Sequence, residues 1–363
     1  MDNETVRRLR LHATGLTGPR WDAPAAVVAW FGAVQSQDFA PAIWSLGHRV
    51  GGVGEDALLR ACDDGALLRT HVLRPTWHFV TPADIRWLLA LTAPRVHASS
   101  AYYYRQNELD EATRGRAADV LAAALAGGQQ RTRTELREAL TAAGIPCDGL
   151  RLGLLLMSAE LEGVICSGAR RGKQHTYALL DERVPPAPAL SREEALATLT
   201  RRYFRSHGPA TTADFRWWSS LTAADVKEGL ALVGDDLVSG EVDGLTFWWA
   251  PEVEDATALP SPTAHLLQAY DEYLVAYRDS QHVADPGGRA RATVQERPVF
   301  NAALLVDGRA AGRWKRTLTR RALTLEVALL DPLDAAETEA LHAAADAYAA
   351  FLGRTASVRT WVV

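Results

Sequence analysis

Cysteine and long apolar runs are scarce in this sequence, and each scarcity excludes a class of protein. Three cysteines occur among 363 residues, Cys62, Cys147 and Cys166, and their spacing fits neither a zinc site nor a redox pair. No apolar run is long enough to span a bilayer, and the start MDNETVRRLRLHATG lacks the apolar centre of a signal peptide. We therefore expect a cytoplasmic protein without disulfides, metal, other cofactors or a membrane partner.

An overall excess of basic charge is also lacking, because the net charge is −5. The two signs are nevertheless separated: acidic residues dominate from Asp225 to Glu272, and basic residues dominate from Arg289 to Arg321, ending in RWKRTLTRR. Such a stretch attracts polyanions only at short range, because salt screens its field beyond about 8–10 Å. Charge alone leaves two interpretations open, contact with nucleic-acid phosphates and a solvated face balanced by the acidic segment.

What the sequence does contain is a repeated order of helices and strands. Ser or Thr stands three residues before an acid at Thr132, Ser191, Thr211 and Thr222, which is typical of a capping box at a helix start. Between Glu111 and Leu180, three helical segments precede the strand VICSG, the basic tip ARRGK and the strand HTYALL. This is the element order of a winged helix-turn-helix.

The same order recurs on both sides of this segment, which predicts an α+β fold of three tandem winged helix-turn-helix units and a small C-terminal α+β domain. The predicted boundaries are 1–110, 111–186 and 187–259 for the three units and 260–363 for the C-terminal domain, with Asp334 capping its helix. The third helices of units two and three, GLRLGLLLMSAELEG and TAADVKEGLALVG, are apolar and acidic, so neither suits the major groove. The winged helices are therefore interpreted as a scaffold rather than as readers of base sequence.

The segment VQSQD in the first unit places Gln35 and Gln37 on either side of Ser36. Residues two apart lie on one side only in an extended chain, so these amides can converge only if the preceding helix has ended by about Val34. The residues alone equally allow two surface glutamines at a frayed helix end. Asp38 is expected to cap the following helix rather than to act as an acid.

VQSQD, HVLRPTWHFV, the tandem winged helices and AHLLQAYDEYLVAYRDS together resemble the winged-helix family of AlkZ-like and YcaQ-like bacterial DNA glycosylases, over essentially the whole chain. That family carries Gln-x-Gln in its AlkZ-like branch and Gln-x-Asp in its YcaQ-like branch. Gln35 and Gln37 thus match the AlkZ-like branch, and Ser36 departs from its aliphatic middle residue. The resemblance implies a monofunctional, metal-independent glycosylase that removes N-alkylated purines such as N7-alkylguanine from double-stranded DNA, in repair or in self-resistance to a genotoxin.

Two amides are chemically sensible for such a substrate. Ordinary glycosidases need one carboxylic acid to protonate the leaving group and a second carboxylate to activate water or attack the sugar. An N7-alkylated guanine already carries positive charge, so its departure needs little proton donation. The resemblance implies that Gln35 and Gln37 position the attacking water, and that neutral bases such as uracil are poor substrates.

Further candidate residues fall into two sets. Those expected to contact DNA are mostly basic residues of the first hairpin, the second wing and the C-terminal stretch: Arg69, Arg74, His78, Arg170, Arg171, Lys173, Arg313, Lys315, Arg316, Arg320 and Arg321. Those expected near the base pocket are Ser36, Asp38, Trp77, Tyr270 and Asp271. The competing interpretation is that turn charges are solvated and that aromatic residues such as the FRWWSS and TFWWA tryptophans fill the core.

We expect a monomer that binds duplex DNA. The alternative function is a non-catalytic winged-helix DNA-binding or regulatory protein on the same scaffold. A third, a protein-interaction role, is favoured if the basic stretch proves to be buried.

Overall fold

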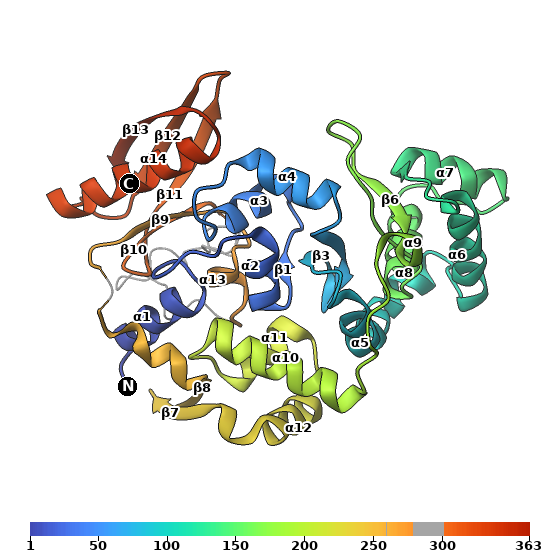
Figure 1. Cartoon of the computed structure of the whole chain (residues 1–363), viewed down its shortest axis with the longest axis horizontal. Coiled ribbons are helices and arrows are strands. Elements are labelled where there is room, and N and C mark those ends of the chain that lie inside the picture. Colours follow the sequence, from blue (N-terminus) through green and yellow to red (C-terminus); the bar gives the residue numbers. More distant parts are fainter. Residues whose placement is uncertain (259, 279–300) are drawn as a thin grey trace.

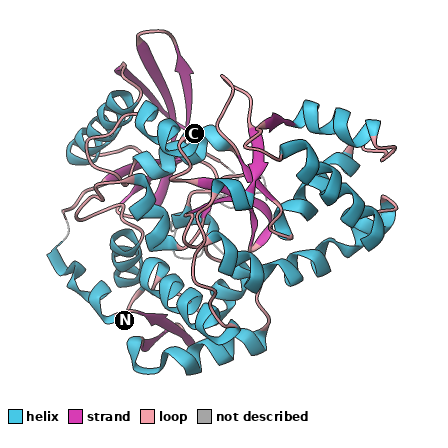
Figure 2. Ribbon diagram, turned by 45° about the vertical axis from the view of Figure 1, so that its right-hand side comes forward, coloured by secondary structure: helices cyan, strands magenta, loops and turns pink. Residues whose placement is uncertain are grey.

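The fold was analysed in a computed structural model that describes residues 1–258, 260–278 and 301–363. Helices surround four sheets formed by the described strands (Figures 1 and 2). This confirms the predicted α+β class. Residues 289–300, the first part of the predicted basic stretch, lie outside the described residues.

The first repeat follows an N-terminal helix, α1 (Asn3–Ala13). Its elements are α2 (Pro24–Phe31), β1 (Val34–Gln35), α3 (Phe39–Gly47), α4 (Glu55–Asp63), β2 (Leu68–Val72) and β3 (Arg74–Val80). The strands pair in the order β1-β3-β2, so the short strand after the first helix joins the closing hairpin. A long helix, α5 (Ile85–Gln106), then leads to the second repeat.

The second repeat has the same element order and the equivalent strand order, β4-β6-β5. Its elements are α6 (Glu111–Leu125), β4 (Arg131–Thr132), α7 (Arg133–Ala142), α8 (Leu150–Leu161), β5 (Ile165–Ser167) and β6 (Thr176–Leu179), followed by the short α9 (Leu180–Arg183). As its apolar sequence predicts, α8 is buried along most of its length, so it serves the core.

The third repeat reduces its first strand to a single bridge between Ala210 and Trp248. Its elements are α10 (Arg192–His207), α11 (Thr212–Ser219), α12 (Ala223–Val233), the 3-10 helix η1 (Gly234–Asp236), β7 (Val238–Val242) and β8 (Leu245–Trp249), followed by η2 (Pro251–Ala258). Three repeats of one element order are compatible with three winged helices. The domain boundaries within the chain stay predictions.

Local sequence signals explain where several helices begin. Thr132, Ser191, Thr211 and Thr222 each accept a backbone N–H with their side chain while the acid three residues later accepts theirs, as predicted. Asp334 does the same at the start of the C-terminal helix. These reciprocal bonds satisfy donors that a helix start otherwise leaves unpaired.

The C-terminal domain is a five-stranded sheet in the order β13-β12-β11-β10-β9, covered by α14. Its elements are β9 (Ala264–Leu267), α13 (Glu272–Val275), β10 (Ala303–Val306), β11 (Arg309–Leu318), β12 (Ala322–Leu329), α14 (Ala335–Phe351) and β13 (Thr355–Val362). The predicted turn joins β10 to β11 at Asp307 and Gly308, both with positive φ. β12 and β13 run parallel, with α14 as the crossover that parallel strands require.

The first repeat lies between the C-terminal domain on one side and the other two repeats on the other (Figure 1). Apolar residues of α2, α3 and α4 share a core with the C-terminal sheet and α14, and the Trp44 indole donates to the carbonyl of Leu266 at 2.8 Å. A separate core joins β2, β3 and α5 to the second and third repeats. Among the described helices, none has the length and apolarity needed to cross a membrane. The three cysteines are free and buried.

Candidate functional site

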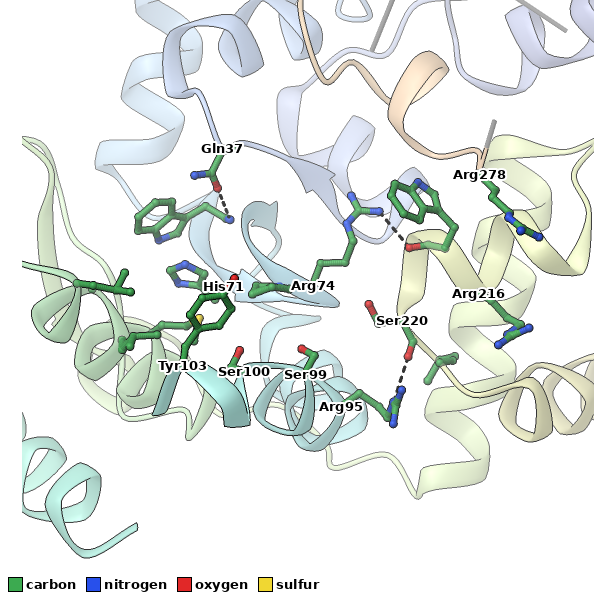
Figure 3. A pocket seen from close by; sticks show the side chains of 18 of the residues that line it. Gln37, His71, Arg74, Arg95, Ser99, Ser100, Tyr103, Arg216, Ser220 and Arg278 are labelled. Carbon is green, nitrogen blue, oxygen red and sulfur yellow. Dashed lines mark hydrogen bonds between the residues drawn. The ribbon is translucent and has the colours of Figure 1, made fainter. Parts of the chain in front are cut away.

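A cavity of about 1000 Å³ opens where β2 and β3 meet α5, α8 and α11 (Figure 3). Its described lining residues are Gln37, His71, Arg74, Pro75, Trp77, Arg95, Ser99, Ser100, Tyr103, Leu150, Gly153, Leu154, Met157, Ala213, Arg216, Trp217, Ser220, Leu221 and Arg278. All three repeats contribute to it. Ligand sites in proteins occupy roughly 300–1,000 Å³, so this cavity is large enough for a nucleobase with a sizeable substituent.

Four arginines from distant parts of the chain line this cavity: Arg74 of β3, Arg95 of α5, Arg216 of α11, and Arg278 just after α13. No aspartate or glutamate stands among the described residues that line it. Arg95, Arg216 and Arg278 are solvent-exposed. A concave wall that carries one sign of charge focuses the electric field, which favours an anionic partner.

Two aromatic side chains at the cavity are exposed to a degree that is unusual for their size. Tyr103 of α5 is 52% exposed and Trp217 of α11 is 50% exposed. Exposed aromatic faces next to cationic groups are the combination on which unpaired nucleobases stack. The cavity therefore offers both charge for a phosphate backbone and flat surfaces for bases.

The glutamine segment is extended, as convergence of its amides requires. α2 ends at Phe31, with Gly32 at φ 84° as its C-cap. β1 then pairs with β3, Val34 opposite Phe79 and Gln35 opposite His78. Gln37 lines the cavity, and its Oε1 accepts the backbone N–H of Trp77 at 3.3 Å (Figure 3). This bond uses the amide oxygen and does not involve the amide NH₂ group.

Gln35 lies one layer behind the cavity wall. It is 6% exposed, and its Oε1 accepts from Nη2 of the cavity residue Arg74 at 2.6 Å. Nη1 of Arg74 also donates to the carbonyl of Trp218 at 3.2 Å. The two glutamines therefore reach the cavity differently, Gln37 directly and Gln35 through Arg74.

A buried carboxylate, Glu272, holds this strand in place. It is fully buried, and its Oε1 accepts the backbone N–H of Gln35 at 2.6 Å. Its Oε2 accepts the Trp218 indole N–H at 3.0 Å and contacts Nε2 of His207 at 3.2 Å. Burial lowers the pKa of His207, so its neutral ring can donate to the carboxylate. Glu272 thereby ties the glutamine strand to the third repeat.

Two residues of the first hairpin that were expected to face DNA point into the protein instead. His78 is completely buried, with Nδ1 at 2.9 Å from the carbonyl of Thr76. The expectation that His78 contacts DNA is therefore corrected. The guanidinium of Arg69 donates to the carbonyls of Ser36 at 3.0 Å and Gln37 at 3.1 Å. Arg69 therefore holds the glutamine segment, because its donors are directed at that backbone.

The basic residues of the second wing and of β11 lie outside the cavity wall. Arg170 pairs with Asp63 at 2.7 Å and Arg171 pairs with Glu135 at 2.8 Å, whereas Lys173 is exposed at the wing tip. On β11 and the following turn, the exposed members are Arg313, Lys315, Arg320 and Arg321. Arg316 is half-buried and donates to the Tyr348 hydroxyl. DNA contact by these residues stays a prediction.

Of the five residues expected at the pocket, Trp77 alone is among the described lining residues. Ser36 is fully buried, and Asp38 begins α3 exposed and without a side-chain cap bond. Tyr270 is half-buried before α13 and is not among the described lining residues of the cavity. The expected pocket position of Ser36 is a correction, because its side chain is fully buried, whereas pocket roles of Asp38 and Tyr270 stay predictions.

The expected pocket role of Asp271 is also a correction, because its carboxylate forms a buried ion pair. Its carboxylate binds the Arg49 guanidinium at 2.8 Å, and both side chains are 1% exposed. Burial alone would raise the pKa of the Asp271 carboxyl. The Arg49 guanidinium and the Ser45 hydroxyl together outweigh this effect, so the pKa lies below its usual value. Removing one partner of such a pair typically costs about 3–5 kcal/mol, which marks Asp271 as structural.

Sequence reasoning missed Arg95, Arg216, Arg278, Tyr103 and Glu272. The tyrosine run Tyr102 to Tyr104 at the end of α5 was an available signal, since consecutive aromatics cannot all face one core. The arginines carried no signal, because each stands alone in its own segment. Within the residues that the structure describes, no three His, Cys, Asp or Glu side chains gather in a way that could hold a metal ion.

Comparison with known proteins gives a consistent picture. The model of the family described as AlkZ-like DNA glycosylase matches residues 28–351. An interstrand DNA cross-link repair glycosylase from Streptomyces sahachiroi is 26% identical over 322 residues, covering 82% of this chain and 83% of that protein. The solved structure of the Streptomyces sahachiroi DNA glycosylase AlkZ superposes with a TM-score of 0.81 at 22% identity, covering 99% of this chain and 100% of that one.

Proposed function

The chain belongs to the family of AlkZ-like DNA glycosylases, and from this premise we propose that it hydrolyses the N-glycosidic bond of N-alkylated, cationic purines such as N7-alkylguanine in double-stranded DNA. It acts in this proposal as a cytoplasmic monomer without a metal. The reaction replaces the bond from the sugar C1′ to the purine by a bond from C1′ to a water oxygen and leaves an abasic site.

The lining of the cavity carries this proposal. Its described residues include four arginines, an amide, an imidazole and hydroxyls, and no carboxylic acid. A glycosidase that acts on a poor leaving group places an acid beside it. A purine that is already cationic leaves as a neutral base, so a wall without an acid suits it. The arginines contact the phosphates on either side of the lesion and offset its charge.

Gln37 is the residue that holds water in this proposal. Its Oε1 is anchored on the backbone of Trp77, and its NH₂ group is directed by that anchor. Gln35 acts through Arg74, which it orients in the cavity wall. Positioning of this kind lowers the barrier without proton transfer from the amide, since it fixes the water near the reacting carbon in advance.

The substrate class extends in this proposal to purines whose alkyl group continues into a larger adduct or an interstrand cross-link. A guanine bridged at N7 carries the same charge as one methylated there, so its departure follows the same chemistry. The cavity of about 1000 Å³ leaves room beyond the purine ring. Such a substrate fits both repair and self-resistance to a DNA-alkylating compound.

Alkali cleavage of a defined duplex tests the proposal. The full chain is incubated with DNA that contains one 7-methylguanine, and abasic sites are then cleaved. We expect strand breaks with the wild type and their loss in the Gln35→Ala, Gln37→Ala double variant, whereas exposed Gln129→Ala leaves them unchanged. Retention of DNA without breaks by the wild type would instead support the non-catalytic DNA-binding function.

A further inference from the structure

A histidine and a buried carboxylate stand beside the water-holding amide. His71 of β2 lines the cavity and is 6% exposed. Its Nδ1 contacts Oε2 of Glu160, a carboxylate of α8 that is 1% exposed. The other oxygen of Glu160 lies 3.4 Å from the indole nitrogen of Trp77, within hydrogen-bond reach. His71 and Glu160 thus form a pair whose imidazole is in the cavity wall and whose carboxylate is behind it.

The carboxylate determines which nitrogen serves the cavity. When Nδ1–H donates to Glu160, the lone pair of the neutral ring is on Nε2. Nε2 has no hydrogen-bond partner among the described residues, whereas Nδ1 is occupied. The ring packs on Trp77 with centroids 4.3 Å apart, which fixes its plane. His71 therefore presents a proton acceptor in a fixed orientation.

Trp77 connects this acceptor to Gln37. Its backbone N–H donates to Oε1 of Gln37, its indole reaches Glu160, and its ring packs on His71. Gln37 and His71 lie on the same wall of the cavity in Figure 3. A water held by the amide is therefore held close to the imidazole.

We propose that His71 accepts the proton of the attacking water and that Glu160 positions the ring and stabilises its charged form. This step rests on the proposed function. The water oxygen forms its bond to C1′, and the bond from C1′ to the purine nitrogen breaks with its electron pair moving to the cationic base, which leaves neutral. The water proton passes to Nε2 of His71, gives an imidazolium paired with Glu160, and is released to solvent after the reaction.

The step fills a need that two amides leave. A cationic purine removes the need for an acid, but attack by water still liberates a proton, and an amide cannot take it. A positioned general base contributes about 10²–10⁴-fold to such steps. His71 is thus a catalytic residue in this proposal, and Glu160 is a positioning residue.

Charged and titratable groups from several elements surround His71. The titratable and charged groups that face it or share its wall are Arg69 on β2, Arg74 and His78 on β3, Glu160 on α8, and Arg95 and Tyr103 on α5. Burial lowers the pKa of His78 far below its usual value, so His78 stays uncharged. Glu160 is the one negative group in this set, and it is in direct contact with the ring.

Single-turnover excision of 7-methylguanine, measured from about pH 5 to 9, tests the proposal. The wild type is expected to lose activity toward low pH, because a general base must be unprotonated to accept the proton of the water. His71→Gln is expected to slow the plateau rate about 100-fold and to remove this acid limb. Glu160→Gln is expected to move the acid limb to lower pH, because a protonated ring then lacks its carboxylate. A purely structural role of Glu160 would not move the limb.

The matched control is His342→Gln on the exposed outer face of α14, which is expected to leave rate and limb unchanged. If the wild type excises the base and His71→Gln keeps both its rate and its acid limb, His71 is not the base, and the proposed glycosylase function stands. If the wild type excises nothing, the proposed function itself fails. If His71→Gln does not fold, Glu160→Gln decides, and an unshifted limb overturns the proposal.

Discussion

The cavity and strand β11 are both basic, but they are built in opposite ways. On β11 and its turn, the basic residues follow one another in sequence and spread along an exposed strand. At the cavity, Arg74, Arg95, Arg216 and Arg278 are scattered through the chain and meet only in the fold. A run of charges is easily found in a sequence, whereas convergence on a concave wall is what concentrates a field.

The difference suggests a division of roles. Charges on an open strand are well hydrated and screened within about 8–10 Å, so under the proposed function we expect them to guide DNA without fixing it. Charges in the cavity wall stand next to the aromatic rings and the amide that would receive a base. We therefore expect cavity variants to change tight binding and catalysis, and β11 variants to change mainly the salt dependence of weak binding.

The largest expected effect comes from removing the cavity charges together. If Arg95, Arg216 and Arg278 each neutralise one phosphate, the triple alanine variant flattens the log–log salt slope of DNA binding by about 2–3 and weakens affinity at 0.1 M salt by about 100-fold or more. The matched variant replaces Arg313, Lys315 and Arg320 by alanine and is expected to lose less. Fluorescence anisotropy across a salt series measures both, and the reverse ranking would place the DNA on the C-terminal sheet.

The second prediction compares two half-buried arginines that each hold a neutral oxygen. Arg74 binds the amide of Gln35, and Arg316 binds the hydroxyl of Tyr348. Arg74→Ala is expected to slow excision about 100-fold, because a misplacement of about 1 Å at a reacting centre has that effect. Arg316→Ala is expected to stay within about threefold of the wild type. Single-turnover rates measure both, and equal losses would mean that the two basic regions serve one site.

The third prediction uses two neighbouring tyrosines that differ in position. Tyr103 is 52% exposed and lines the cavity, and Tyr102 is 58% exposed and is not among the described lining residues. Tyr103→Ala is expected to weaken binding of lesion-containing DNA about tenfold, within the 1–3 kcal/mol that stacking on one base contributes. Tyr102→Ala is the control, and an equal loss in both variants would exclude a specific stacking position.

The same contrast explains how far the sequence could be interpreted. Capping boxes and the order of elements predict the fold class, because they depend on residues three or four apart. The position of Gln37 follows from the end of α2, which the local sequence also signals. The cavity could not be predicted, because residues 74, 95, 216 and 278 become neighbours only through packing between repeats. Asp271 was misjudged for a related reason, since its partner Arg49 is remote in sequence.

The smallest predicted effect concerns buried histidines. On the C-terminal side, Nε2 of His48 lies 3.4 Å from Nδ1 of His265 between α3 and β9, and on the cavity side His78 and His207 are fully buried. Burial lowers the pKa of His48, and it lowers that of His265 to about 4.

The unfolded chain, with histidine pKa values near 6.5, therefore binds more protons than the folded chain between about pH 6.5 and 4. The contribution of these histidines to the free energy of unfolding is therefore complete above about pH 6.5 and is lost as the pH drops through this window. For His265 alone, the loss at pH 5.5 is about 1 kcal/mol. Thermal melts from pH 7 to 5 of the wild type, His265→Gln and the exposed control His342→Gln measure this. His265→Gln is expected to flatten the pH dependence, because it removes one proton that only the unfolded chain takes up. An unchanged slope would assign the acid sensitivity to the other buried histidines with lowered pKa values, His48, His78 and His207.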